Sequence, residues 1–382
     1  MPEMPEQENV LQRGLRNVYL DRTKSSFIDG KAGKLLYRGY NIDDLATFSS
    51  FEETCYLLIF GKLPNQNQLH DFESQMRENR AIPEPVTEII DGIKAAHPMD
   101  VLRTAISALS AFDADTEDHS PDATVRKSIR LTSQASTIVT YHSRIRSNLD
   151  IVPPSLDLNH AGNFLYMLTG VKPIQEDIDL IDKDFILHAD HGLNASAFTA
   201  RVVASTRADI HAAITAGLSA LKGPLHGGAA EGVMKMATDI GNEANIPDYI
   251  SSLRQQNKPV MGFGHPVYKT VDPRSLHLRE GARTLSQRKG RPQWFEVLET
   301  LIDVMQPYAK KGVHPNVDFW SGAVYSLLDI PEDLFISIFG LGRVPGWAAQ
   351  VIEQYSANYI IRPRLQYDGP TDSEYQPIEQ RT

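Results

Sequence analysis

The sequence predicts an all-α protein of two helical domains with one small β-hairpin near its amino terminus. The chain has 382 residues, too many for one compact core, and a usual domain size of about 150 residues suggests two domains. Apolar residues recur at helical spacing through most of the chain. Strand signals are few and do not alternate with helices, which disfavours a doubly wound parallel sheet.

Turn and capping residues predict the first elements. Phe27-Ile28 and Leu35-Leu36-Tyr37 flank an Asp29-Gly30 turn and predict the hairpin. Residues 50–53 match a capping box, in which a serine hydroxyl and a glutamate satisfy free backbone amides at the start of a helix. Gly61 stands where that helix should end.

Apolar spacing predicts the later helices. The first of them follows residues 97–100, and its buried face comprises Leu102, Ala105, Ile106, Leu109 and Phe112. An alanine-rich helix over residues 209–222 ends directly before Gly223-Pro224, and its buried face comprises Ile210, Ile214, Leu218 and Leu221. Pro331, followed by two acidic residues, predicts a further helix start, because proline loses no hydrogen bond in a first turn.

Composition limits the classes of function. A net charge of −10 opposes binding to nucleic acid and anionic membranes. Cys55 is the single cysteine of the sequence, so neither an internal disulfide nor a thiolate metal cluster can form. Apolar runs such as residues 55–60 fall short of the roughly 20 residues that cross a bilayer, and the acidic start lacks the pattern of a secretory signal. We therefore expect a cytoplasmic protein, with disorder only at residues 1–10 and 368–382.

One segment reverses the charge balance. Between Arg254 and Arg291 the chain carries nine basic and two acidic residues, so this basic segment has a charge of +7 and the remainder −17. Local positive charge is what a small phosphorylated ligand requires, although a solvated helix face would show the same composition.

Four segments place histidine or aspartate among glycines and small residues, and these are residues 188–192, 223–228, 262–268 and 316–322. Glycine lets a backbone approach a ligand closely and allows a histidine at a turn to be aimed. Any one such histidine could instead serve only to bond a nearby carbonyl.

The order and content of these segments resemble the citrate synthase family along nearly the whole chain. Gly223-Pro224-Leu225-His226-Gly227-Gly228-Ala229 resembles the loop of its first catalytic histidine. Gly262-Phe263-Gly264-His265, followed by Asp272-Pro273-Arg274, resembles its second histidine and a substrate arginine. Pro315-Asn316-Val317-Asp318 resembles the loop of the catalytic aspartate.

Three further matches follow the same order. Residues 188–196 resemble the segment whose second histidine, here His191, contacts the 2-oxo acid. Residues 342–347 and 361–363 resemble the places of two arginines that hold substrate carboxylates, here Arg343 and Arg362.

The resemblance implies a citrate synthase-like two-domain fold and a homodimer, which could assemble further. The large domain would comprise residues 1–222 and 330–382, and residues 223–329 would form a small domain that closes over the site. Arg362 would come from the neighbouring subunit. The resemblance implies no permanently bound cofactor and no metal.

The implied activity is that of an acyltransferase of the tricarboxylic acid cycle, which joins acetyl-CoA, oxaloacetate and water into citrate and CoA. Asp318 would be the base that forms the enol, and His226 would stabilise charge on the thioester oxygen. His265 would polarise the ketone of the 2-oxo acid. A neutral imidazole suits a donor role if its other nitrogen is occupied.

The remaining site residues would bind the substrates. Arg274, Arg343 and Arg362 would hold carboxylates in two-point fashion, His191 would add a hydrogen bond, and Arg80 would reach the substrate as a related arginine does in methylcitrate synthases. The backbone implied to lie along CoA comprises Pro259, Val260, Met261, Gly262 and Phe263, and the implied phosphate partners are Lys269 and Lys311.

Three positions depart from the family pattern. Pro266 replaces a frequent arginine, and a proline there is common in 2-methylcitrate synthases, which use propionyl-CoA. One methylene is worth only about 1–3 kcal/mol in an apolar pocket, so both acyl groups stay open as substrates. Asp190 stands where glutamate is frequent, and Pro345 is expected to interrupt a helix.

Two rival functions remain. A metal-dependent hydrolase could use His188, His191, His226 and Asp318, since a His-x-x-His pair can face one way on a helix. A catalytically idle helical assembly protein could keep the fold. Retention of both catalytic histidines and the aspartate argues against the second rival.

Overall fold

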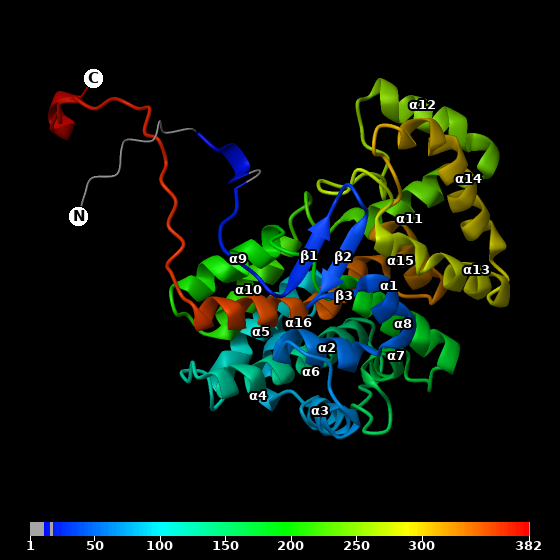
Figure 1. The fold of residues 1–382 in the computed structure, drawn as a ribbon, viewed down its shortest axis with the longest axis horizontal. Coiled ribbons are helices and arrows are strands. Elements are labelled where there is room, and N and C mark those ends of the chain that lie inside the picture. The colour runs from blue at the N-terminus through cyan, green and yellow to red at the C-terminus, as the bar shows by residue number, and fades with distance from the viewer. Residues whose placement is uncertain (1–10, 16–17, 382) are drawn as a thin grey trace.

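The computed structural model describes residues 11–15 and 18–381, and within them it contains 16 α-helices and one small sheet (Figure 1). The first eight helices are α1 (Ile42–Phe48), α2 (Phe51–Phe60), α3 (Gln66–Glu78), α4 (Glu84–Gly92), α5 (Pro98–Leu109), α6 (Pro121–Arg146), α7 (His160–Thr169) and α8 (Gln175–His188). The last eight are α9 (Ala195–Ser205), α10 (Ile210–Leu221), α11 (Ala229–Ile240), α12 (Ile246–Gln255), α13 (Arg279–Arg288), α14 (Pro292–Ala309), α15 (Val317–Leu327) and α16 (Phe335–Ser356). The prediction of a helical protein is confirmed.

The predicted hairpin forms, with a short third strand added. Strands β1 (Ser26–Asp29) and β2 (Lys34–Tyr37) pair antiparallel, and β3 (Tyr40–Asn41) extends the sheet in the order β1-β2-β3. The Asp29 carboxylate accepts hydrogen bonds from the backbone amides of Lys31 and Ala32 at 2.9 and 3.0 Å, which fixes the turn. A two-residue strand is too short to leave a pattern in the sequence.

Helix α2 begins and ends at the predicted residues. Ser50 Oγ accepts the amide of Glu53 at 3.1 Å, and Gly61 ends the helix in a left-handed conformation with φ 79°. Within the described residues Ser50 makes this cap without the reciprocal glutamate bond, so half of the predicted capping box forms.

The predicted buried faces of α5 and α10 are confirmed with one exception. The four apolar residues of α10 and the first four of α5 are buried. Phe112 is instead 47% exposed. The chain tightens into a 3₁₀ turn at Ser110–Phe112 after α5, and three residues per turn move this side chain off the buried face.

Helix α16 is the most enclosed helix of the described chain. It continues through Pro345, so the predicted interruption was wrong. Packing on nearly all sides holds the helix together although proline removes one hydrogen bond. By length and composition Glu332–Ser356 could cross a membrane, but 89% of the qualifying window is buried inside the protein, as in a core helix.

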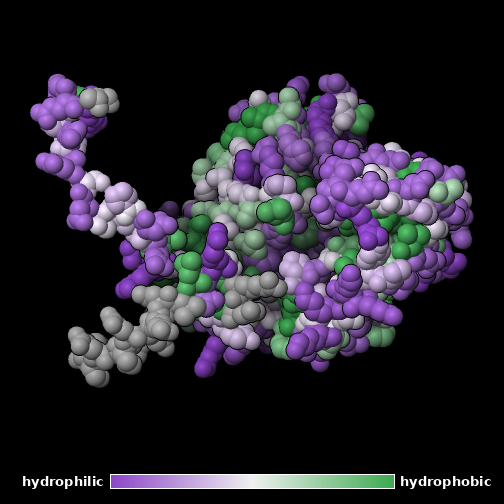
Figure 2. Space-filling model, turned by 90° about the horizontal axis from the view of Figure 1, so that it is seen from above, coloured by the Kyte–Doolittle hydropathy of each residue, from purple (hydrophilic) through white to green (hydrophobic). Residues whose placement is uncertain are grey.

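The helices form two groups in Figure 1. Helices α11 to α14 gather in one lobe at the upper right, and α15 lies where this lobe meets the other helices. Residues 357–381 leave the end of α16 as an extended segment with many exposed side chains (Figure 1). The disorder expected for residues 1–10 falls outside the described residues. Figure 2 shows a largely hydrophilic face with a hollow near its centre.

Candidate active site

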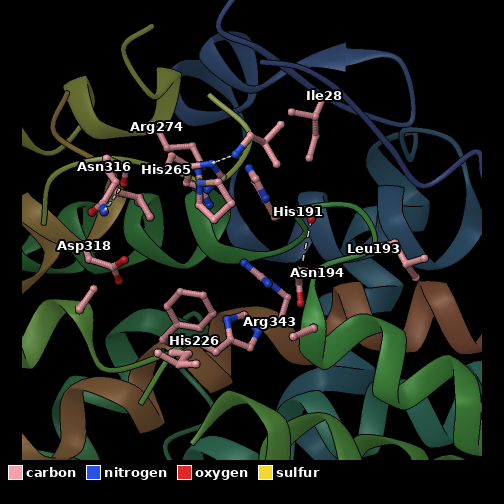
Figure 3. A pocket seen from close by; sticks show the side chains of 18 residues that line it. Ile28, His191, Leu193, Asn194, His226, His265, Arg274, Asn316, Asp318 and Arg343 are labelled. Carbon is pink, nitrogen blue, oxygen red and sulfur yellow. Dashed lines mark hydrogen bonds between the residues drawn. The ribbon is translucent and has the colours of Figure 1, made fainter. Parts of the chain in front are cut away.

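A cavity of about 460 Å³ lies between the hairpin, the start of α15 and the middle of α16. Six of the predicted site residues line it together: His191, His226, His265, Arg274, Asp318 and Arg343. Figure 3 shows the side chains of His265, Asp318 and His226 around one central space, with Arg343 beside it. These six residues are spread over the sequence from position 191 to position 343, and the fold brings them to one place.

His226 follows α10 and is held by α9. Its Nε2 atom lies 3.3 Å from the Ser196 amide nitrogen, which donates to it, and 2.9 Å from the Ser196 hydroxyl. A backbone N–H can only donate, which favours the tautomer with Nε2 as acceptor and the proton on Nδ1. Burial, with the charge of Arg343, lowers the His226 pKa to about 4. His226 is therefore a neutral imidazole at neutral pH.

His265 is held in the same way by its own loop. Its Nδ1 atom accepts the backbone amides of Val267 and Tyr268 at 3.0 and 3.2 Å, so the proton of the neutral ring belongs on Nε2. Burial, with the charge of Arg274, lowers the His265 pKa to about 4. The ring can donate from Nε2.

Asp318 lies in the first turn of α15. No hydrogen bond to its carboxylate is formed by the described residues, although it lines the cavity. Burial raises its pKa, which makes it a stronger base than an ordinary aspartate. The amino terminus of α15 stabilises the ionised form of the Asp318 carboxylate.

Two buried arginines give one wall of the cavity positive charge. Arg343 donates from Nε to the His188 carbonyl, and its guanidinium carbon lies 4.8 Å from the centre of the Phe339 ring. Burial lowers the Arg343 pKa to about 10, partly offset by Asp190. Arg274 donates to both carboxylate oxygens of Asp272 at 3.0 and 2.7 Å, so only part of its fork is left for a substrate.

His191 lies beside the second histidine and near the two arginines. Its Nε2 atom lies 3.1 Å from the Tyr268 hydroxyl, and its ring centre lies 5.0 Å from that of His265. Burial and the nearby Arg274 hold the His191 pKa well below its usual value. A neutral His191 can donate a hydrogen bond to a carboxylate or ketone oxygen without adding a further positive charge beside the arginines.

The amino-terminal hairpin joins two of the site loops. Ser25 Oγ donates to Asp190 at 2.8 Å, and the Gly192 amide donates to Ser26 Oγ at 2.9 Å. At the hairpin turn, the Lys269 amide donates to the Gly30 carbonyl at 2.8 Å. The hairpin therefore contacts the loop of His191 at its base and the loop of His265 at its tip.

Sequence reasoning did not identify the residues that hold the predicted site residues in place. Ser196, Asp272 and Tyr268 fix His226, Arg274 and His191, and Trp347 donates to Ser196 Oγ at 3.1 Å. All four stand in or near the matched segments, but only their three-dimensional neighbours reveal what they hold.

Two predicted substrate arginines lie outside this cavity. Arg80 is buried, and its guanidinium donates to the carbonyls of Ser155 and Leu158. These bonds hold the guanidinium outside the cavity wall, and its contact with the substrate stays a prediction. Arg362 is exposed and lines a second cavity of about 890 Å³, which shares Leu193 and Ala195 with the first.

The predicted CoA residues lie beside the cavity rather than in its wall. Residues 259–263 lead into the loop of His265, and Pro259 is exposed. Lys269 and Lys311 are both exposed. Of the nine basic residues in the basic segment, six form ion pairs with acids: Arg274, Arg279, Arg283, Arg288, Lys289 and Arg291.

Within the described chain, no group of three or more His, Cys, Asp or Glu side chains is arranged to hold a metal ion. His188, which the hydrolase alternative requires, donates from Nδ1 to the Asp184 carbonyl at 2.8 Å. The geometry gives that alternative no ligand set.

Comparisons with known proteins agree with the geometry. The family model described as "Citrate synthase, C-terminal domain" matches residues 14–364. "Citrate synthase 2" of Bacillus subtilis is 44% identical, over 97% of this chain and 99% of the relative. "2-methylcitrate synthase 1" of Corynebacterium glutamicum is 38% identical, over 98% of this chain and all of the relative.

Solved structures match over the same length. The citrate synthase of Pyrobaculum aerophilum has a TM-score of 0.92 and 38% identity, covering 97% of this chain and 95% of its own. The citrate synthase of Thermoplasma acidophilum, solved as a ternary complex with carboxymethyl coenzyme A and oxaloacetate, has a TM-score of 0.92 and 32% identity, covering 97% of this chain and all of its own. The chain belongs to the citrate synthase family.

Proposed function

We propose that this acyltransferase condenses acetyl-CoA with oxaloacetate and water to give citrate and CoA. The observation that carries the proposal is the convergence of two imidazoles with fixed protons and one unbonded carboxylate on a single cavity. The chemistry needs a base and a charge-stabilising donor on the thioester, and a second donor on the ketone.

In the first step, Asp318 removes a proton from the acyl methyl group, and Nδ1–H of His226 donates to the thioester oxygen as the enol forms. The enol carbon then attacks the ketone carbon of oxaloacetate. His265 gives its Nε2 proton to the ketone oxygen, which becomes the hydroxyl of the citryl thioester, and the proton that Asp318 removed restores the neutral imidazole. Water finally attacks the thioester carbonyl, the carbon–sulfur bond breaks, and CoA leaves as the thiol.

Oxaloacetate would bind along the arginine wall. Arg343 and the free part of the Arg274 fork supply positive charge, and His191 supplies a neutral hydrogen bond. The charges of Arg343 and Arg274 would pair with the two carboxylates of oxaloacetate.

We propose a homodimer in which Arg362 completes the site of the neighbouring subunit. Support comes from the second cavity, which is lined largely by apolar residues, includes Arg362 and adjoins the first cavity through Leu193 and Ala195. We also propose the division into a large domain of residues 1–222 and 330–382 and a closing small domain of residues 223–329. The separate lobe of α11 to α14 in Figure 1 supports it.

CoA would lie along residues 259–263, with its phosphates near Lys269 and Lys311. Support comes from the ion-pair pattern, because the cations of the basic segment without an acidic partner in the described chain are Arg254, Lys258 and Lys269. The absence of a permanent cofactor, the absence of a metal and a cytoplasmic location stay predictions.

The alternative acyl donor is propionyl-CoA, which would give 2-methylcitrate. Pro266 lines the cavity, and the chain has relatives named for each activity. A thiol-release assay with oxaloacetate tests both proposals. We expect release with acetyl-CoA, and a kcat/KM ratio between the two donors within about 200-fold, the range for one methylene. No release with either donor would contradict the proposed function.

A further inference from the structure

The helix that begins at Asp318 is anchored by one buried carboxylate from another helix. Asp184 of α8 is fully buried, and its two oxygens accept hydrogen bonds from α15. Ser321 Oγ donates to Oδ1 at 2.7 Å, and the Tyr325 hydroxyl donates to Oδ2. Ser321 also lies 3.1 Å from the Val317 carbonyl, a longer and weaker alternative within its own helix.

The two donors lie on the same side of α15 as the proposed base. Ser321 and Tyr325 follow Asp318 by three and seven residues, the spacing of one helix face. Bonds at two successive turns fix both the position and the rotation of a helix. Asp184 therefore fixes the direction in which the first turn of α15 presents the Asp318 carboxylate.

Burial of this carboxylate needs an explanation beyond packing. Removing a charge from water is costly, and apolar side chains of similar volume hold helices together at least as well. A carboxylate with two hydroxyl donors costs stability but defines one geometry. A loss of stability in return for one defined geometry is useful where the position of a reacting group matters.

We propose that Asp184 is a positioning residue, which holds the Asp318 carboxylate toward the acyl methyl group by anchoring α15 to α8. The inference rests on the proposed role of Asp318 as base. It also links the two proposed domains, since α8 belongs to the large domain and α15 to the small one.

Asp184 also contributes to the electrostatics of the base. The charged and titratable groups that face Asp318 are His188 and Asp184 of α8, Asp272 and Arg274, His226, Tyr325 of α15, and Arg343 of α16. Burial is the main cause of the raised Asp318 pKa, His188 and Arg274 oppose it, and Asp272 and Asp184 add to it. Loss of the Asp184 charge should therefore lower the Asp318 pKa.

The first test removes the hydroxyl donors without changing charge. Tyr325→Phe and Ser321→Ala each loosen the anchor. Because a misplacement of about 1 Å can cost about 10²-fold in rate, we expect the double variant to lower kcat by about 10-fold or more. The KM for oxaloacetate should stay near the wild-type value, because the arginines that bind it are not on α15. The matched control is Tyr355→Phe, which removes a buried hydroxyl that donates to the Ala208 carbonyl at 2.5 Å.

The second test separates positioning from simple support of the fold. Asp184→Asn keeps the shape and removes the charge. The base must be deprotonated, so kcat/KM falls as pH falls through its pKa, and the acidic limb of the Asp184→Asn profile should move to lower pH. Tyr325→Phe keeps the charge, so its acidic limb should not move to lower pH. Support of the fold alone would move neither limb.

The inference is overturned if the double variant keeps kcat within about twofold of Tyr355→Phe, or if the Asp184→Asn limb stays in place. Failure of the proposed function is recognised separately, because Asp318→Asn would then keep near-normal turnover. A rise in the KM for oxaloacetate with unchanged kcat would also overturn the inference, since it would assign Asp184 to substrate binding.

Discussion

Phe263 and Pro315 form an antiparallel β-bridge between the loop that precedes His265 and the loop that precedes Asp318. Two backbone hydrogen bonds of 2.8 and 2.9 Å flank the bridge. These hydrogen bonds hold the two loops together. In the proposed reaction, the base acts on the acyl-CoA and the histidine acts on the ketone, so the bridge keeps the two reacting carbons in register.

Replacing Asp318 by Asn should lower kcat by about a hundredfold or more, the usual size for a lost general base. The amide has the same shape but cannot accept the proton. Steady-state thiol release measures the loss, with Asp303→Asn, an exposed change in α14, as control. Near-normal rates would show that another group is the base.

Replacing His226 by Ala should cost about 10²–10³ in kcat, because it removes a donor to the developing oxyanion. Oxaloacetate binding should change little, since its proposed partners lie elsewhere in the cavity. Calorimetric titration with oxaloacetate and thiol release measure the two effects. His70→Ala, at an exposed site on α3, is the control. Unchanged turnover would remove His226 from the mechanism.

Arg362→Ala should be inactive alone yet regain activity when its subunits are mixed with Asp318→Asn subunits. In a mixed dimer, one site has both wild-type residues if Arg362 acts across the interface. Random assembly of a two-fold dimer would give about a quarter of the wild-type activity. Refolding the two variants together, against each refolded alone, measures this. No gain on mixing would place Arg362 in its own subunit's site.

Acidification should destabilise the fold through the buried histidines whose pKa values are lowered, among them His226 and His265. The pKa values of His226 and His265 are about 4 in the fold, whereas an unfolded histidine has about 6.5. Between these values the unfolded chain binds more protons, so the free energy of unfolding falls as pH falls from about 6.5 to about 4. His265→Gln cannot titrate and should lose less Tm than wild type between about pH 7 and pH 5. His70→Gln is the control, and equal losses in all three would contradict the assignment.

Gly30→Ala should weaken oxaloacetate use although residue 30 touches no substrate. A Cβ at this position would overlap the Val267 carbonyl oxygen, which forces the hairpin away from the loop of His265. Overpacking of this kind costs about 1–3 kcal/mol, and the lower bound predicts a rise in KM of at least about fivefold. Gly92→Ala is the control, because a Cβ there meets nothing within 4 Å. An unchanged KM would show that the hairpin contact has no role in binding.

The residues that line the cavity together could be predicted from the sequence because each stands in a local pattern. The residues that hold these side chains in place could not be predicted in this way. The partner of His226 is an amide 30 residues away, and the anchor of α15 is a carboxylate 137 residues before Ser321. Such pairs depend on how helices pack, which no local spacing reveals.

The ion pairs of the basic segment could not be predicted from local sequence either. Counting residues within 254–291 gave a strong positive excess, yet several partners lie outside that range. Arg279 pairs with Glu299, Arg288 with Asp177, and Arg291 with Asp329 at 2.7 Å. The partners of Arg80 could not be predicted for a similar reason, since the carbonyls that bind its guanidinium belong to a distant loop. Pro345 shows that enclosure of a helix can override a local breaker.

The turn of the hairpin carries lysines at both ends, and Lys31 and Lys34 are exposed. Trypsin cuts after lysine only where the backbone can leave its contacts. Cleavage after Lys31 would loosen the contacts of the hairpin with the loops of His191 and His265. Every proposed catalytic side chain would stay in the sequence. A ligand that orders those loops should slow cleavage at Lys31. The rate of tryptic cleavage therefore measures how much of the protein has ligand bound, without an assay of turnover.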